Sequence, residues 1–186
     1  AKPGDFNSLG LTERLVAAVT ALGYEEPTPV QREAIPVLLS GRDVLGQAAT
    51  GTGKTAAFAL PLLQRISEDG QERGRTSGLV LVPTRELAMQ VAEAIHKYAK
   101  GVGLSIVPLY GGAAMDQQIR ALKRGAEVVV ATPGRALDHI GRRTLRLDAV
   151  RVVVLDEADE MLDMGFAEDL ELILEATPKE RQTVLF

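Results

Sequence analysis

Short apolar runs and longer amphipathic segments alternate along most of the chain. The apolar runs predict strands at 43–47, 78–82, 104–110, 127–131, 150–155 and 183–186. The segments between them have helical spacing and predict helices at 9–22, 29–40, 56–67, 84–98, 114–124, 133–140 and 166–175. Strands that alternate with helices of this length indicate an α/β fold, in which helices cover both faces of a parallel β-sheet.

Residue types at the ends of these segments support the assignments. Gly23 ends the first helix, Pro29 opens the second, and Pro36 is expected to kink that second helix. Thr84 is in the N-cap position of the helix that follows the strand at 78–82. The first helix is expected to bury Leu11, Leu15, Val16, Val19 and Leu22. The helix after Thr84 is expected to bury Leu87, Val91, Ile95 and Tyr98.

The composition fits one globular unit. The chain has 186 residues, of which 46% are hydrophobic, and no linker or internal repeat divides it, so we expect residues 1–186 to form a single lobe. Cysteine is absent, which excludes disulfides and thiolate metal sites. The two histidines, His96 and His139, are too far apart to suggest a metal site, and both are expected on solvent-facing helix surfaces. No apolar run is long enough to span a bilayer, so we expect a cytoplasmic protein without a membrane segment.

The charge balance limits how the chain could bind nucleic acid. The formal net charge is −4 and the isoelectric point is about 5.3. A protein that binds nucleic acid through a broad basic face usually has the opposite balance. Any such contact is therefore expected to use backbone amides, helix N-termini and a few arginines.

Residues 48–55 read AATGTGKT and lie between a predicted strand and a predicted helix. That context is typical of a phosphate-binding P-loop. Glycine lets backbone N–H groups turn toward phosphate oxygens, and the helix that follows presents its positive N-terminal end to the same anion. Lys54 is expected to neutralise the β- and γ-phosphates, and the Thr55 hydroxyl is expected to ligate Mg²⁺.

The strand predicted at 150–155 ends in two adjacent carboxylates, Asp156 and Glu157. Ligands of parallel α/β sheets bind at the carboxyl ends of strands, so this pair is expected beside the P-loop. Asp156 is the candidate Mg²⁺ ligand, partly through water, and Glu157 is the candidate base that activates the attacking water. Lys54, Asp156 and Glu157 are thus the predicted catalytic residues of a nucleotide-hydrolysing site.

The first position of the loop is Ala48, where the general P-loop pattern has glycine. The alternative interpretation is a glycine-rich turn that precedes Lys54 and Thr55 by chance. The acid-terminated strand downstream argues against this alternative.

Residues 156–159 spell DEAD, and other motifs occur in order before them. They are the isolated aromatic Phe6, GYEEPTPVQ at 23–31, AATGTGKT at 48–55, PTREL at 83–87, Gly111-Gly112 and TPGR at 132–135. With these motifs the chain resembles, over nearly its whole length, the first RecA-like lobe of a DEAD-box ATP-dependent RNA helicase. Alanine is common at the first P-loop position of that family, which accounts for Ala48.

The resemblance implies an ATP site. Gln31 is expected to read adenine, because an amide offers a donor and an acceptor to the N6 and N7 edge of the base. Phe6 and Tyr24 are expected to pack on the base. Without the family motifs, Gln31 would be interpreted as a solvated helix residue and the two aromatics as core residues. The phosphates are expected to be held by Ala48, Ala49, Thr50, Gly51, Thr52, Gly53, Lys54 and Thr55.

The resemblance also implies contacts to an RNA backbone, with little sequence preference. Two similar strand-to-helix corners would offer helix N-terminal N–H groups to phosphates. They contain Pro83, Thr84 and Arg85 in one case, and Thr132, Pro133, Gly134 and Arg135 in the other. Gly111 and Gly112 would let the sugar-phosphate backbone approach closely. Ordinary turn chemistry is the alternative for each segment.

Asp159 corresponds to the family residue that couples the nucleotide site to a Ser-Ala-Thr motif. In the family, that motif and a second RecA-like lobe with arginine fingers would follow Phe186. We therefore expect this chain alone to bind adenine nucleotide, to hydrolyse it poorly and not to unwind RNA. The acidic run after the DEAD segment is expected to be a solvated helix face, formed by Glu160, Asp163, Glu168, Asp169 and Glu171.

Two other interpretations stay open. A P-loop enzyme of another class, such as a small-molecule kinase or a DNA translocase, would share the loop but would not need the PTREL and TPGR segments. A non-catalytic lobe for nucleotide sensing or protein docking would not need both Lys54 and Glu157.

Overall fold

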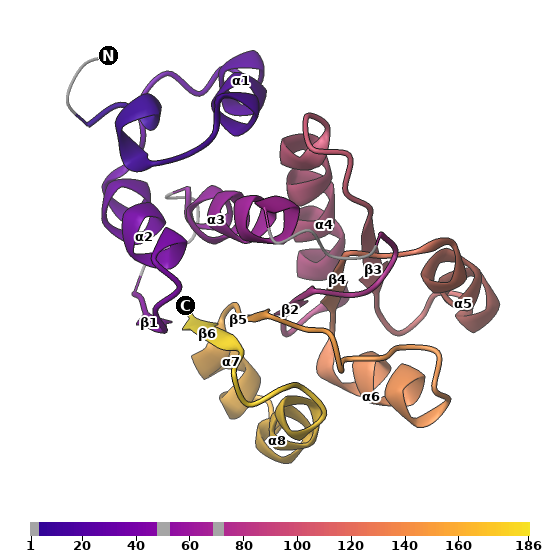
Figure 1. Cartoon of the computed structure of the whole chain (residues 1–186). Helices are drawn as coiled ribbons and strands as arrows, with labels where there is room; N and C mark the ends of the chain where they lie inside the picture. The colour runs from indigo at the N-terminus through magenta and orange to yellow at the C-terminus, as the bar shows by residue number, and fades with distance from the viewer. Residues whose placement is uncertain (1–3, 48–52, 69–72) are drawn as a thin grey trace.

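A computed structural model describes residues 4–47, 53–68 and 73–186. Six parallel strands form one sheet in the order β1-β6-β5-β2-β4-β3 (Figure 1). The strands are β1 Val44–Leu45, β2 Gly78–Leu81, β3 Ile106–Leu109, β4 Val128–Ala131, β5 Val152–Leu155 and β6 Gln182–Leu185. The predicted α/β fold with a parallel sheet is confirmed.

The central strands are apolar on both sides because helices cover both faces of the sheet. Every residue of β2, β4 and β5 is buried. Successive side chains point to opposite faces, so Val80 and Val154 pack in one core while Leu79 and Val153 pack in the other. The uninterrupted apolar run of each central strand therefore contributes side chains to both cores.

The helices divide between these two cores (Figure 1). The first core is covered by η1 Phe6–Leu9, α1 Glu13–Ala21, α2 Pro29–Leu39, α3 Lys54–Glu68 and α4 Arg85–Ala99. The second is covered by α5 Met115–Arg124, α6 Pro133–Gly141, α7 Ala158–Asp163 and α8 Ala167–Glu175.

The strand register brings the sequence motifs to one edge of the sheet. Leu81, the last residue of β2, pairs with Leu155 of β5 and with Ala131 of β4. Ala131 also pairs with Leu109, the last residue of β3. Because these strands are parallel and end level, the segments that follow them emerge side by side at the carboxyl edge.

The helix predicted at 9–22 is wrong in its extent. Gly10 is left-handed, with φ 95°, and Thr12 is extended, so a short 3-10 turn and α1 replace one long helix. Leu22 lies beyond α1 and is 40% exposed, so the predicted apolar face ends at Val19. Five strands are also shorter than predicted, β6 has the predicted length but begins one residue earlier, and α7 was not predicted at all.

Candidate nucleotide and RNA site

Lys54 lies between the two acids that end β5. Its Nζ is 2.8 Å from Oδ1 of Asp156 and donates a 2.6 Å hydrogen bond to Oε1 of Glu157. The side chains of Lys54 and Asp156 are almost fully buried, whereas that of Glu157 is 24% exposed. The structure thus brings together the three predicted catalytic residues, from the start of α3 and the end of β5.

Burial and ion pairing have opposite effects on the pKa values of Lys54 and Asp156. Burial by itself would lower the pKa of Lys54, but its two acidic neighbours, Asp156 and Glu157, together raise that pKa above its ordinary value. Burial raises the pKa of Asp156, and the neighbouring Lys54 only partly offsets that rise. Lys54 is therefore firmly cationic, while the pKa of Asp156 stays above its ordinary value in spite of Lys54.

The buried Asp156 carboxylate fits a magnesium ligand. Its Oδ1 is inaccessible to solvent and, although close to Lys54, accepts no hydrogen bond of good geometry. Mg²⁺ in nucleotide sites takes one or two protein oxygens together with phosphate oxygens. Thr55 lines the same hollow as Lys54 and Asp156. In the described segments, no cluster of three or more acidic, histidine or cysteine side chains could hold a metal ion.

Glu157 has an unusual backbone for a residue with a side chain. Its φ of 56° and ψ of 48° are left-handed, and it precedes α7. The next residue, Ala158, donates its N–H to the Phe186 carbonyl at 3.0 Å, so β6 holds the start of α7. Strained backbone of this kind concentrates at functional sites. Asp159 is exposed, and its Oδ1 accepts a hydrogen bond from Glu160 N–H.

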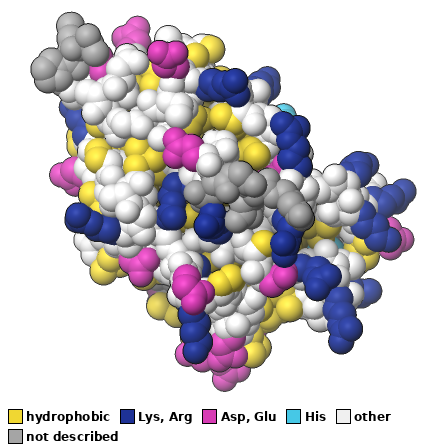
Figure 2. All heavy atoms as spheres, viewed as in Figure 1, with side chains coloured by type: hydrophobic (Ala, Val, Ile, Leu, Met, Phe, Trp, Pro, Cys, Tyr) yellow, Lys and Arg dark blue, Asp and Glu magenta, His cyan; other side chains and the backbone are white. Residues whose placement is uncertain are grey.

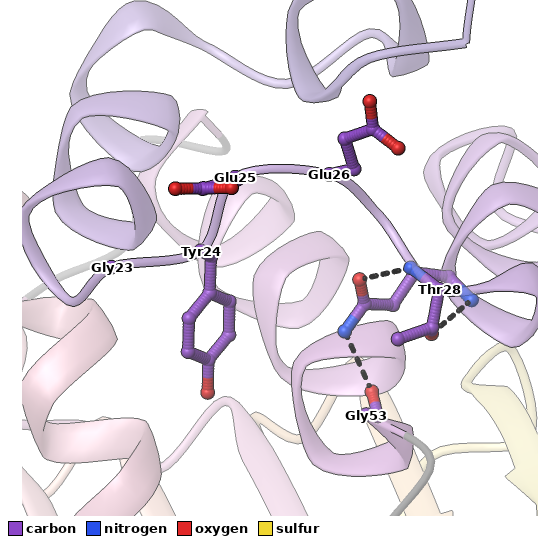
Figure 3. A pocket seen from close by; sticks show the side chains of 7 residues that line it. Gly23, Tyr24, Glu25, Glu26, Thr28 and Gly53 are labelled. Carbon is purple, nitrogen blue, oxygen red and sulfur yellow. Dashed lines mark hydrogen bonds between the residues drawn. The ribbon is translucent and has the colours of Figure 1, made fainter.

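Gln31 joins the start of α2 to the end of the glycine-rich loop. Thr28 and Gln31 form a capping box: Gln31 Oε1 accepts from Thr28 N–H at 2.9 Å, and Thr28 Oγ1 accepts from Gln31 N–H. Gln31 Nε2 donates to the Gly53 carbonyl at 3.0 Å (Figure 3). Gln31 is 2% exposed, so it is not a solvated helix residue.

Gly53 is the point at which the loop approaches this cap. Its φ is +83°, and a Cβ there would lie 2.4 Å from Gln31 Nε2 and 2.9 Å from Thr28 Oγ1. Only glycine suits both the conformation and the space. The rest of the predicted phosphate loop, Ala48, Ala49, Thr50, Gly51 and Thr52, lies outside the described residues.

A hollow of about 570 Å³ opens beside this cap, with Tyr24 on one side and Thr28 and Gly53 on the other (Figure 3). Its volume is in the range of small-ligand sites. Tyr24 is half-buried, and its hydroxyl is 2.7 Å from that of Tyr98. Phe6 is 3% exposed and lies in the core, with its ring 6.5 Å from the Tyr24 ring. In this conformation Tyr24 borders the hollow. Phe6 is a core residue, as in the alternative interpretation of its role.

The first predicted RNA corner follows β2. Thr84 caps α4 by accepting a 3.2 Å hydrogen bond from Leu87 N–H, which confirms the predicted N-cap. Pro83 is buried and Arg85 is exposed. A Cβ on Gly112 would come within 2.8 Å of Arg85 Nη1, so the guanidinium lies against that glycine. The fold thus brings Arg85 and the Gly111-Gly112 turn together, although β4 separates their strands.

The second predicted RNA corner follows β4. Thr132 precedes α6 without a side-chain capping bond, Pro133 is buried and Gly134 is exposed. The Arg135 side chain is 14% exposed, and its Nη1 donates to the Ala113 carbonyl and to Gln118 Oε1. Part of this arginine is therefore used within the protein. On the face shown in Figure 2, Lys and Arg side chains occur in small groups with Asp and Glu between them.

The surface position predicted for His139 is wrong. Its side chain is 0% exposed and contacts Gln118 and Thr144 through its two ring nitrogens, whereas His96 is exposed as expected. Burial lowers the pKa of His139, and the charges of Arg135 and Arg142 lower it further. The sequence analysis also missed Gln118 and Thr28. Each could have been identified as a polar residue at a position that the periodicity assigns to a buried helix face or to a helix cap.

The parallel sheet, with a lysine at the start of α3 facing a pair of strand-end acids, defines the RecA-like class of α/β domains. A profile of the DEAD/DEAH box helicase family matches residues 28–186, and the chain belongs to that family. It is 53% identical over 181 residues to "DEAD-box ATP-dependent RNA helicase CshA" of Bacillus cereus, with 97% of this chain and 34% of the relative covered. It is 51% identical to "ATP-dependent RNA helicase CshA" of Listeria monocytogenes, with the same coverage.

A solved structure has the same fold. The crystal structure of a DEAD box protein from the hyperthermophile Methanococcus jannaschii superposes with a TM-score of 0.91 at 45% identity, covering 98% of this chain and 49% of that one. This chain spans about a third of the length of the curated relatives that it matches. In the described segments, no helix is both long and apolar enough to cross a lipid bilayer.

Proposed function

We propose that this chain is the ATP-binding lobe of a cytoplasmic ATP-dependent RNA helicase, in which ATP hydrolysis is coupled to local separation of RNA duplexes. The observation that carries the proposal is the buried Lys54–Asp156–Glu157 trio at the same sheet edge as the Arg85, Gly112 and Arg135 segments. Nucleotide and RNA bound at one edge could influence each other through the strand ends that they share.

In this proposal Lys54 exchanges partners when ATP binds. Phosphate oxygens would compete for the ammonium group that now neutralises Glu157. Glu157, the more exposed of the two acids, would then be free to orient and deprotonate water. Asp156 and Thr55 would hold Mg²⁺, which when bound would neutralise charge on the phosphates. Asp159 is proposed to couple this site to a Ser-Ala-Thr motif in the same protein.

Adenine is proposed to bind in the hollow beside Tyr24. An amide has two acceptor lone pairs and two donor hydrogens. Gln31 uses one acceptor position on Thr28 and one donor on Gly53, which leaves one of each for the adenine edge. Phe6 would have to leave its core position to stack on the base, so we assign that contact to Tyr24 first.

RNA is proposed to bind through its backbone at the corners that contain Pro83, Thr84, Arg85, Gly111, Gly112, Thr132, Pro133, Gly134 and Arg135. Helix N-termini attract phosphates without a large positive net charge, which suits a chain of charge −4. A second RecA-like lobe of the same protein would close over both ligands and supply arginine fingers. Arginine fingers accelerate phosphoryl transfer by a factor of roughly 10³–10⁵. The 186-residue chain alone is therefore expected to bind ATP and to hydrolyse it slowly.

The deciding experiment is steady-state ATP hydrolysis by the full-length protein that carries this lobe, with and without RNA. Strong stimulation by RNA that Glu157→Gln abolishes would support the proposal. Glu160→Gln, an exposed acid in α7 three residues further on, is the matched control and should hydrolyse ATP normally. Hydrolysis that ignores RNA would favour a nucleotide-binding module, and preferential stimulation by single-stranded DNA would favour a DNA translocase.

A further inference from the structure

A buried polar network lies beneath the Gly111-Gly112 turn and the start of α6. Gln118 of α5 is 6% exposed and His139 of α6 is 0% exposed. Their side chains meet at 2.8 Å, between Gln118 Oε1 and His139 Nε2. On the far side of the ring, Nδ1 is 2.8 Å from the Thr144 hydroxyl. Neither Gln118 nor His139 has a role in the function proposed above.

Gln118 is the centre of the network because it bonds in three directions. Its Nε2 donates to the Tyr110 carbonyl at 2.9 Å, and its Oε1 accepts from Arg135 Nη1 at 3.3 Å as well as from His139. Arg135 Nη1 in turn donates to the Ala113 carbonyl at 3.2 Å. Tyr110 and Ala113 flank the two glycines, so the turn is pinned on both sides.

The donors and acceptors are fixed by chemistry. The amide nitrogen must face the Tyr110 carbonyl, which can only accept, so the amide oxygen faces Arg135 and His139. His139 must then carry a hydrogen on Nε2, and a neutral ring accepts at Nδ1 from the Thr144 hydroxyl, whose single hydrogen is shared with the His139 carbonyl at 3.1 Å. Both lone pairs of the Gln118 oxygen are used. A buried polar network whose members are hydrogen-bonded to one another in this way stabilises one arrangement of them.

The Gly111-Gly112 turn needs such support. Gly111 has no neighbour near its Cβ position, and Gly112 has a φ of +88°. Glycine allows a ligand backbone to approach, but it also has the largest conformational freedom of any residue and no side chain to restrict it. The hydrogen bonds to the Tyr110 and Ala113 carbonyls restrict the conformation of the turn, which the two glycines cannot do themselves.

We infer that Gln118 is a positioning residue for RNA, which holds Arg135 and the Gly111-Gly112 turn in the arrangement that a sugar-phosphate backbone meets. This inference rests on the proposed RNA-binding function. Because Nη1 of Arg135 is used inside the protein and Nε faces Asp138 Oδ2 at 3.9 Å, the phosphate contact falls mainly to Nη2 of its guanidinium. Arg135 is thereby a fixed fork rather than a flexible cation.

The test is RNA binding by the full-length protein that carries this lobe, measured by fluorescence anisotropy with a labelled single-stranded oligouridylate over a series of salt concentrations. Gln118→Met keeps the length of the side chain and removes its polar atoms. We expect binding about five- to tenfold weaker. The slope of log affinity against log salt should fall by about 0.7, the value of one phosphate contact on a single strand. Gln117→Met, the exposed neighbour on the same helix, should change neither quantity.

Three further measurements separate positioning from general packing. ATP affinity of Gln118→Met should equal that of the wild type, and a parallel loss would overturn the inference. Gln118→Met should add little to the effect of Arg135→Gln, whereas additive losses would show that Gln118 does not act through Arg135. His139→Gln retains a donor toward Gln118 and should bind RNA within about twofold of the wild type. His139→Leu lacks that donor and should resemble Gln118→Met.

The outcomes also separate this inference from the proposed function. If the wild-type protein binds no RNA, the proposed function fails. If the wild-type protein binds RNA and Gln118→Met binds it equally well with an unchanged salt slope, only the positioning role fails.

Discussion

The carboxyl edge of the sheet has two halves that are built on different physical principles. The nucleotide half, at the end of β5 and the start of α3, places one buried cation against two acids, Lys54 against Asp156 and Glu157. The RNA half, at the ends of β2, β3 and β4, relies on one capping hydroxyl, an amide, a neutral imidazole and backbone carbonyls. Arg135 contacts a backbone carbonyl and an amide oxygen, and the ion pairs of this half are long, at 3.8 Å for Arg85–Glu86 and 3.9 Å for Arg135–Asp138.

This difference shows how one acidic chain could combine the two anion-binding regions that we propose. Buried opposite charges depend on each other, because removal of one leaves the others desolvated and unpaired. Neutral dipoles and helix N-termini have smaller individual effects and need no compensating charge. The nucleotide half should therefore respond to single substitutions with large effects, and the RNA half with small and separable ones.

The largest expected effect is that of Lys54→Met. Two acids would stay at the site without their cation, so we expect a loss of about 3 kcal/mol in the free energy of unfolding. ATP affinity should fall by more than about a hundredfold, because the phosphates lose their cation as well. Urea unfolding and nucleotide titration measure the two effects. Lys97→Met, which breaks the exposed pair with Glu93 at 3.5 Å, is the control and should cost less than about 0.5 kcal/mol. Equal costs for the two variants would contradict the contrast between the halves.

The next effect concerns the junction between the glycine-rich loop and the α2 cap. Gly53→Ala combines a left-handed φ with a Cβ 2.4 Å from Gln31, and we expect it to cost about 2 kcal/mol or more and to weaken ATP binding. Gly165→Ala is matched in backbone, with φ +87°, but has open space around its Cβ. It should cost about 1 kcal/mol and leave ATP affinity unchanged. Thermal unfolding with and without ATP measures stability and ATP binding for both variants. Equal results for the two variants would show that the steric contact at Gly53 has no consequence.

A smaller effect is expected from the cap on the RNA side. Thr84→Ala removes the acceptor of the Leu87 N–H, so we expect a loss of about 1 kcal/mol, together with weaker RNA binding and normal ATP binding. Thr132 occupies the corresponding place before α6 but makes no capping bond. Thr132→Ala should therefore change stability by less than about 0.5 kcal/mol. Chemical denaturation compares them, and a larger loss for Thr132→Ala would refute the assignment of caps.

The smallest expected effect is the pH dependence that His139 adds to the RNA half. Burial and the charges of Arg135 and Arg142 lower its pKa below the ordinary 6.5, against a weaker opposite effect of Asp138. As pH falls below 6.5, the unfolded chain takes up a proton that the folded chain refuses, so stability decreases. Between pH 7.5 and 6.0 this contribution is at most about 0.8 kcal/mol.

His139→Gln should remove that part of the pH dependence in urea unfolding. His96→Gln is the control, because it shows how loss of an exposed histidine changes the pH dependence of unfolding. A pH profile that His139→Gln leaves unaltered would show that His139 does not titrate differently in the folded and unfolded states.

Much of the fold was predictable because its signals are local. The uninterrupted apolar runs of β2, β4 and β5 predicted a sheet covered on both faces, and Thr84 marked the start of α4. Boundaries were less predictable where backbone conformation overrode periodicity, as at Gly10 and Thr12. The short α7 was missed because its first residue follows a left-handed Glu157, a conformation that no residue pattern announces.

The candidate site shows the same division. The glycine-rich loop, the strand-end acids and the two strand-to-helix corners were recognisable because each is a short, contiguous pattern. Gln31 was identified as a site residue, but its capping box and its bond to Gly53 were not expected. His139 was assigned to the surface because nothing in its neighbours along the chain reveals that Gln118 and Thr144 meet it in the interior.

The sequence by itself determined the alternation of strands and helices and the acids at the end of β5, and it predicted the phosphate loop, since these depend on neighbouring residues and on period. Only the tertiary structure decided that Lys54 would meet Glu157, 103 residues away, and that Arg85 would lie against Gly112. Those contacts follow from the order and register of the parallel strands, which set which loops emerge together. Strand order is a property of the packed sheet, because it arises from contacts between segments that are distant along the chain.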